Sequence, residues 1–261
     1  MNRRTFIAVS GTAGLCSLAA NESVAAQAET GGRQYLELQK YMFESEAQRG
    51  AFDAFLKDAL IPAANRLGCR PVGVFCDAKE PSPLYVLLPH ATLEAAASLK
   101  ERMLGDAELG AKAAAVLDGP KSALPFKEVE SSLMLAFKGV PAVQTPVKSP
   151  GRVFQLRIYE SPSLLTARKK IEMFNDGGEL AIFREVGLAP VFFGETLFGA
   201  KMPNLTYMVG FDDAEQQKAA WGKFGKHPEW QKLRAMPEYA DARIIRAITN
   251  IVLVPAAYSQ V

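Results

Sequence analysis

The chain contains two copies of one structural unit, and this internal repeat limits the folds that it can adopt. The first copy begins with YLELQKYMFES and the second with VFQLRIYESPS. Leu38 and Tyr41 align with Leu156 and Tyr159, 118 residues later. In each copy a strand pattern is followed by a helix that ends at glycine, two strands, a second helix and a last strand. Such periodicity indicates one supersecondary unit that is used twice.

The helices and strands of both copies follow from residue spacing. In the first copy a helix over 46–67 ends at Gly68, and in the second Ser161 is the expected N-cap of a helix that ends at Gly187. Thr92 and Asp213 are the expected N-caps of the second helices. The expected strands are 71–77, 83–89, 190–199 and 205–211 in the middle of the copies, and 128–139 and 242–254 at their ends.

The order βαββαβ predicts an α+β fold in which each copy forms a four-stranded antiparallel sheet with both helices on one face. Two tandem copies can cover their bare faces by packing sheet to sheet. We expect domains at 33–140 and 151–257, joined by a linker at 141–150 that is rich in proline and glycine. Alternation in the first strands assigns one set of residues to the helices, namely Leu36, Leu38, Phe154, Leu156 and Ile158, and another to the space between the sheets, namely Glu37, Gln39, Tyr41, Gln155, Arg157 and Tyr159.

The N-terminus has the pattern of an export signal. Arg3 and Arg4 precede a short, weakly apolar stretch over 6–20, and AQA at 26–28 is a plausible cleavage site. The stretch resembles a twin-arginine signal and predicts an exported, periplasmic or extracytoplasmic protein; an ordinary secretory signal or a disordered tail is the alternative. Removal of 1–28 takes away two of 30 basic and one of 28 acidic residues, which leaves a charge near +1. This balance gives no case for nucleic acid, and the mature chain has no membrane-spanning segment.

The sequence shows no recognisable catalytic motif. Cys69 and Cys76 are read as inert thiols, no metal-ligand spacing is present, and no nucleophile elbow or phosphate-binding loop stands in the right context. His90 is interpreted as a loop residue just before the Thr92 cap. Hydrolase, kinase and nicotinamide-dehydrogenase functions are therefore disfavoured, and no metal is predicted.

The second copy resembles the NIPSNAP family of dimeric α+β barrel proteins. The resemblance rests on FQLRIYE, FGETLFG and the run W-x-x-F…HPEW, and it covers residues 151–257. In the first copy LGDAEL at 104–109 stands where the second has GKHPEW, so that copy is read as a degenerate repeat. The resemblance implies two ferredoxin-like units paired into a fused barrel, but it implies no defined activity.

Two groups of residues are candidate ligand-binding sites. The run WGKFGKHPEW has a structural explanation, in which a helix breaks at His227, restarts at Pro228 and is pinned by Trp221 and Trp230. Haem-binding relatives in the wider superfamily suggest the alternative that His227 is a proton shuttle or an axial ligand. The second group comprises Arg157, Tyr159, Glu195 and Arg246. Here Glu195 would pair with Arg157 or Arg246, either as a structural ion pair or in a pocket for a carboxylate or phenolic oxygen.

Taken together, these patterns favour an exported protein that binds a small apolar ligand or a protein partner. One alternative is a monooxygenase-like or haem-assisted enzyme, in which His227, Tyr159 or Arg157 assists proton transfer. Another is a purely structural or assembly role. No cofactor is predicted apart from the haem alternative, and a homo-oligomer is compatible with the sequence.

Overall fold

The computed structural model describes residues 32–80, 82–120 and 123–261. The predicted export signal at 1–28 lies outside this range. Among the described residues, every helix is too short or too polar to cross a lipid bilayer.

The first unit contains four strands and two groups of helices. The strands are β1 (Tyr35–Met42), β2 (Gly73–Asp77), β3 (Leu84–His90) and β4 (Glu128–Ala136). Between β1 and β2 the chain forms α2 (Glu46–Phe55), a π-helical turn η1 (Leu56–Leu60) and α3 (Ile61–Arg66). Between β3 and β4 it forms α4 (Leu93–Leu104) and α5 (Ala107–Leu117). Thr92 is the N-cap of α4, as predicted, and its side chain accepts a hydrogen bond from the backbone N–H of Ala95.

The second unit repeats this order. Its strands are β5 (Val153–Glu160), β6 (Ala189–Phe198), β7 (Asn204–Phe211) and β8 (Ala247–Pro255). Helices α6 (Leu164–Asn175) and α7 (Glu179–Val186) lie between β5 and β6, and α8 (Ala214–Lys226), α9 (Pro228–Arg234), η3 (Pro237–Tyr239) and α10 (Asp241–Ile244) lie between β7 and β8. Asp213 caps α8 as predicted. The predicted cap Ser161 is wrong, because Ser163 caps α6 in a reciprocal arrangement with Thr166.

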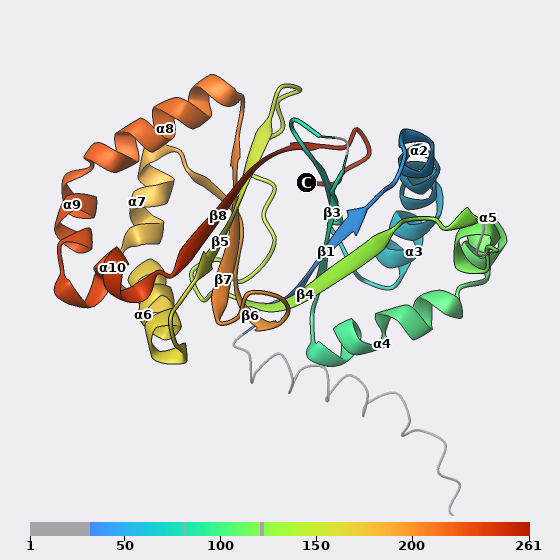
Figure 1. Cartoon of the computed structure of the whole chain (residues 1–261), viewed down its shortest axis with the longest axis horizontal. Coiled ribbons are helices and arrows are strands. Elements are labelled where there is room, and N and C mark those ends of the chain that lie inside the picture. The colour runs from blue at the N-terminus through green and yellow to red at the C-terminus, as the bar shows by residue number, and fades with distance from the viewer. Residues whose placement is uncertain (1–31, 81, 121–122) are drawn as a thin grey trace, which may run out of the picture.

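The eight strands form one closed antiparallel barrel in the order β1-β3-β2-β8-β5-β7-β6-β4. Within each unit the neighbouring strands pair, and the two units join where β2 pairs with β8 and β4 pairs with β6. Helices α2 to α5 cover the barrel on the side of the first unit, and α6 to α10 cover it on the side of the second (Figure 1). The fused α+β barrel predicted from the repeat is thus the observed fold.

The inside of the barrel is apolar, which corrects the predicted assignment of strand faces. Leu36, Leu38, Phe154 and Leu156 pack in the barrel interior with side chains from the other strands, including Phe75, Val191, Phe192, Met208 and Leu253. The prediction that Leu36, Leu38, Phe154 and Leu156 face the helices is therefore wrong. An eight-stranded barrel is just wide enough to be filled by its own side chains, so the middle of this face is closed to water and apolar, while one end opens to the surface at Ile158. The polar residues predicted to line a space between the sheets therefore do not face the barrel interior.

The alternate residues of the same strands face the helices, where they form two further cores. Tyr41 packs with Phe52, Val74, Val86 and Leu99 in the first unit. Tyr159 packs with Phe174, Phe183 and Tyr207 in the second. Polar side chains that were expected inside the barrel therefore lie between each half-sheet and its own helices, and this interface contains the candidate site.

Candidate functional site

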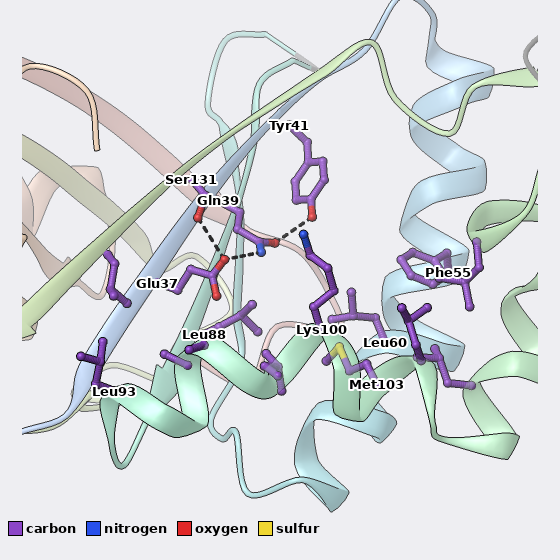
Figure 2. Close-up of a pocket in the computed structure, with 17 residues that line it drawn as sticks. Glu37, Gln39, Tyr41, Phe55, Leu60, Leu88, Leu93, Lys100, Met103 and Ser131 are labelled. Carbon is purple, nitrogen blue, oxygen red and sulfur yellow. Dashed lines mark hydrogen bonds between the residues drawn. The ribbon is translucent and has the colours of Figure 1, made fainter. Parts of the chain in front are cut away.

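A cleft of about 510 Å³ lies between the half-sheet of the first unit and its helices α4 and α5. Most of its wall is aliphatic. The leucines and methionine that line it are Leu60, Leu88, Leu93, Leu99, Met103, Leu104, Leu109, Leu117 and Leu133 (Figure 2). Leu93, Leu104 and Leu117 are exposed by 45%, 58% and 40%. Exposed leucines grouped at one opening are unusual on a protein surface and are typical of a binding site.

The strand side of the cleft carries a connected group of polar side chains. Glu37 and Gln39 of β1 and Ser131 of β4 meet there: Gln39 Nε2 and Ser131 Oγ donate hydrogen bonds to Glu37 Oε1, at 2.7 and 2.9 Å. Tyr41 Oη donates to Gln39 Oε1 at 2.7 Å. Glu37, Gln39 and Tyr41 alternate along β1 and so share a face, and β4 places Ser131 directly opposite Gln39 (Figure 2).

His90 of β3 is a buried member of this polar group, next to Glu37. It is the last residue of β3, its side chain is 1% exposed, and its Nε2 lies 3.4 Å from Glu37 Oε2. The expectation that His90 is a loop residue is wrong. In the repeat, His90 pairs with Tyr35 as Phe211 pairs with Val153, so a histidine replaces a buried phenylalanine. That replacement is the sequence signal that could have identified His90.

Glu37 is held in its ionised form. Burial acts to raise the pKa of this carboxyl, but the contact with His90 and the hydrogen bonds from Gln39 and Ser131 outweigh burial and lower the pKa below its ordinary value of 4.5. The same carboxylate acts on its neighbours. Burial first, and the charge of Glu37 second, raise the pKa of the Tyr41 hydroxyl and raise that of the Cys69 thiol to about 12. The floor of the cleft thus carries a fixed negative charge.

The helix side of the cleft carries one cation. Lys100 of α4 lines the cleft, extends toward the strands and is exposed (Figure 2). Met103 lies one helical turn further along α4, on the same face. The cleft therefore combines an aliphatic body, a buried carboxylate and a solvated ammonium group.

The equivalent cleft of the second unit is filled. Trp221 and Phe224 stand on α8 where Lys100 and Met103 stand on α4, because each pair lies eight and eleven residues after its N-cap. Phe224 packs at 4.9 Å from Phe183 and 4.4 Å from Trp230, measured between ring centroids. Trp221 Nε1 donates to Gln155 Oε1, and Gln155 is the residue equivalent to Glu37. The second cleft is thus closed by aromatic packing.

Arg157 and Tyr159 lie within this filled region and not in an open pocket. The guanidinium of Arg157 lies between the rings of Trp221 and Tyr159, at 4.8 and 5.3 Å from their centroids. Tyr207 Oη donates to Tyr159 Oη at 3.2 Å. These contacts explain both residues as parts of the core.

A buried ion pair supports the same core. Lys170 Nζ lies 2.8 Å from Glu179 Oε2, with side chains that are 1% and 2% exposed. Burial raises the pKa of Glu179, and the nearby charge of Lys170 opposes that rise. Lys170 also lies 4.5 Å from the ring centroid of Phe174. Sequence reasoning missed this pair, which nothing in the spacing of the two residues marks as buried.

Glu195 and Arg246 are apart from each other and from Arg157. Glu195 is exposed and lines a surface depression of about 210 Å³ with Arg33 and Arg168. Arg246 Nη2 contacts Glu160 Oε2 at 2.6 Å. The predicted pairing of Glu195 with Arg157 or Arg246 is therefore wrong. Glu195 of β6 thus lies at the surface next to helix α6.

His227 and Trp230 take the structural role that their sequence suggests. Helix α8 ends at Lys226, α9 begins at Pro228, and His227 between them has extended backbone angles. Trp230 is buried in the second core. His227 Nε2 lies 3.3 Å from Glu185 Oε1. An axial haem ligand must point into a cleft that admits the macrocycle, and here aromatic side chains fill that space. His227 is thus placed at the helix junction with Glu185 as its partner, and the haem alternative stays a prediction.

Metal ligation has no support in the described part of the chain. Across residues 32–80, 82–120 and 123–261, no three His, Cys, Asp or Glu side chains are grouped to hold a metal ion. Cys69 and Cys76 are free thiols. Cys69 is buried, whereas Cys76 is partly exposed and accepts a hydrogen bond from Arg49 Nη2 at 2.8 Å.

Comparison with known proteins agrees with this architecture. Residues 154–260 match the NIPSNAP family model. A NIPSNAP-like domain protein from Burkholderia xenovorans is 22% identical over 41% of this chain and 88% of that chain, with a TM-score of 0.37. No curated protein matches the chain significantly.

Two solved structures resemble the whole barrel. A proposed monooxygenase from Lactobacillus acidophilus NCFM has a TM-score of 0.58 and 10% identity, over 85% of this chain and 94% of that chain. A proposed chlorite dismutase has a TM-score of 0.50 and 14% identity, over 87% of this chain and 96% of that chain. At these identities the similarity shows the fold alone.

Proposed function

We propose that the protein binds a small, largely apolar molecule in the cleft between the half-sheet of the first unit and helices α4 and α5. The observation that carries this proposal is the contrast between the two units. The same position holds Lys100 and Met103 in one unit, where the cleft is open, and Trp221 and Phe224 in the other, where it is filled.

Burial of the ligand supplies the driving force. The leucines at the opening lose water contact when an apolar body covers them, and each Å² of apolar surface removed from water contributes about 25 cal/mol. The polar residues on the strands then fix the orientation of the ligand. A cleft with a mostly aliphatic wall and a few convergent polar groups is the usual form of a small-molecule site. The cleft volume of about 510 Å³ is within the usual range of small-molecule sites, which favours a small molecule over a protein partner.

A second candidate function is an enzyme that removes a proton from the bound molecule. Glu37 favours it, because an ionised carboxylate beside a histidine can accept a proton from a ligand and pass it on. The barrel is shared with a proposed monooxygenase, which suggests oxygen as a co-substrate. The test is oxygen consumption on addition of a bound ligand: consumption that is lost in Glu37→Gln supports an oxygen-dependent enzyme, and an unchanged oxygen level rules out oxygenase activity on that ligand.

Export through the N-terminal segment is a further proposal. The adjacent arginines Arg3 and Arg4 and the small residues at 26–28 support it. Replacement of both arginines by lysine should retain the protein in the cytoplasm. Unchanged export of the double variant would exclude the twin-arginine route.

Fluorescence of N-phenyl-1-naphthylamine, an apolar probe, tests the binding site. The wild-type protein should enhance probe emission and saturate. Ala96→Phe places a ring inside the cleft from α4 and should weaken binding about tenfold or more, because the ring takes up volume that the probe needs. Ala114→Phe on α5, outside the cleft lining, is the matched control. Equal binding by all three proteins would overturn the proposed function.

A further inference from the structure

We infer that the molecule bound in this cleft carries a cationic amine on its apolar body, with Glu37 as the recognition residue. The inference rests on the proposed function and specifies the ligand class. It follows from the arrangement of hydrogen bonds around one carboxylate and from the positions of the charges that face it.

The two oxygens of Glu37 are in different situations. Oε1 accepts hydrogen bonds from both Gln39 and Ser131. Oε2 lies 3.4 Å from His90 Nε2, and that nitrogen lacks a hydrogen bond of good geometry. Figure 2 shows one oxygen taking both dashed bonds and the other turned away from them, toward α4. A carboxylate oxygen can accept more than one hydrogen bond, and Glu37 lines the cleft, so Oε2 can take a donor in addition to His90.

The potential on the cleft floor is negative. Glu37 is 19% exposed as a side chain, and its charge contributes to the raised pKa values of both Tyr41 and Cys69. These two groups lie on different elements around the floor. Tyr41 lines the cleft and Cys69 lies outside it, beside His90, so the charge of Glu37 acts both inside and outside the cleft.

Two other charged or titratable groups face Glu37. His90 approaches from β3 and donates no full hydrogen bond, and Lys100 extends from α4 at the exposed mouth. Water screens an exposed ammonium strongly, whereas a carboxylate on the floor is screened much less. The floor therefore favours a cation and disfavours an anionic head, although a cation stands at the mouth.

An ammonium head fits the open oxygen. It donates a charge-assisted hydrogen bond to Glu37 Oε2, which is stronger than one from a neutral hydroxyl. Its apolar chain then lies along Leu88, Leu99 and Met103. A carboxylate of the same chain length would place two negative charges together on the floor.

Displacement of N-phenyl-1-naphthylamine by decylamine, decanol and decanoate at neutral pH separates these cases, because the three compounds share one chain and differ in the head. In the wild-type protein we expect decylamine to compete about tenfold more strongly than decanol, as a charge-assisted bond implies, and decanoate to be the weakest. In Glu37→Gln the amine should lose its advantage over the alcohol, and decanoate should improve.

Lys100→Met provides a second variant at an exposed position that folding tolerates. It should keep or increase the preference for decylamine and weaken decanoate further. Decanoate as the strongest competitor, or an amine and alcohol of equal strength in the wild type, would overturn the inference while the proposed function stands. Failure of all three compounds to displace the probe would instead count against the cleft as a binding site.

Discussion

Lys100 and Trp221 occupy equivalent positions in the two units, each eight residues after the N-cap of its helix. Trp221 lies over Arg157 and donates a hydrogen bond to Gln155, whereas Lys100 lines an open cleft above Glu37. The two units share one fold and differ in what fills the space between sheet and helices. On the proposed function, the first unit binds the ligand and the second unit gives structural support.

Met103 and Phe224 lie three residues after Lys100 and Trp221, and truncating each of them to alanine should lower the free energy of unfolding by different amounts. Phe224 is buried among aromatic rings, so Phe224→Ala should lower the free energy of unfolding by ~3–5 kcal/mol. Met103→Ala should cost less than about 2 kcal/mol, because one side of Met103 already faces an open space and loses few contacts. Urea denaturation measures both values. Equal costs would show that the first cleft is as tightly packed as the second.

The buried ion pair predicts a recovery on double substitution. Lys170→Met alone should lower the free energy of unfolding by ~3–5 kcal/mol, because it leaves the Glu179 charge buried without its partner. Adding Glu179→Leu should restore most of that loss, since a well-packed apolar pair is often as stable as a buried ion pair. Thermal and urea unfolding of the two variants test this. A double variant with a lower free energy of unfolding than Lys170→Met would contradict the account.

Glu37 should contribute a pH-dependent part of stability. Its pKa is lowered in the folded protein, so the unfolded chain binds this proton more readily. The contribution is therefore present above the ordinary pKa of 4.5 and is lost as pH falls through the folded pKa. Urea unfolding from neutral pH down to about pH 3 should show the gap between wild type and Glu37→Gln shrinking in acid. A stability difference that grows as the pH falls would contradict a lowered pKa of Glu37 in the folded protein.

The corrected strand faces give a further test. Leu156 is 1% exposed inside the barrel, so Leu156→Ala should cost ~2–5 kcal/mol in free energy of unfolding. Ile158 lies on the same face but at the partly open end of the barrel, so Ile158→Ala should cost less. Chemical denaturation compares them directly. A larger loss of stability for Ile158→Ala than for Leu156→Ala would contradict the placement of Leu156 in the closed middle of the barrel.

The sequence predicted the architecture because the repeat and the helix caps are local signals. Thr92 and Asp213 cap their helices as residue type suggests, and Gly187 ends α7 with a positive φ of 87°. Ser161 and Ser163 are both of a residue type that caps well, and the contact of Ser163 with Thr166 that decides between them depends on the backbone path. Alternation separated the two faces of β1 and β5 correctly. It could not show which face is enclosed, because helices cover one and the barrel encloses the other.

The site was harder to predict because it depends on the absence, in the first unit, of the aromatic side chains that fill the same space in the second unit. A cleft appears where Lys100 and Met103 replace aromatic residues, and its polar floor appears where Glu37 and His90 replace Gln155 and Phe211. Each replacement is visible when the copies are aligned residue by residue. The aromatic run of the second copy instead suggested His227 and Trp230 as candidate ligand-binding residues. The structure places His227 at a helix junction and Trp230 in a core.

Methionine methyl NMR tests the central claim most directly. Met103 lines the cleft of the first unit, and Met173 is buried in the core of the second. In protein labelled with ¹³C at the methionine methyls, with Met103→Leu to assign the signal, titration with decylamine should shift the Met103 resonance to saturation and leave Met173 in place. A shift of Met173 with Met103 unchanged would contradict the account.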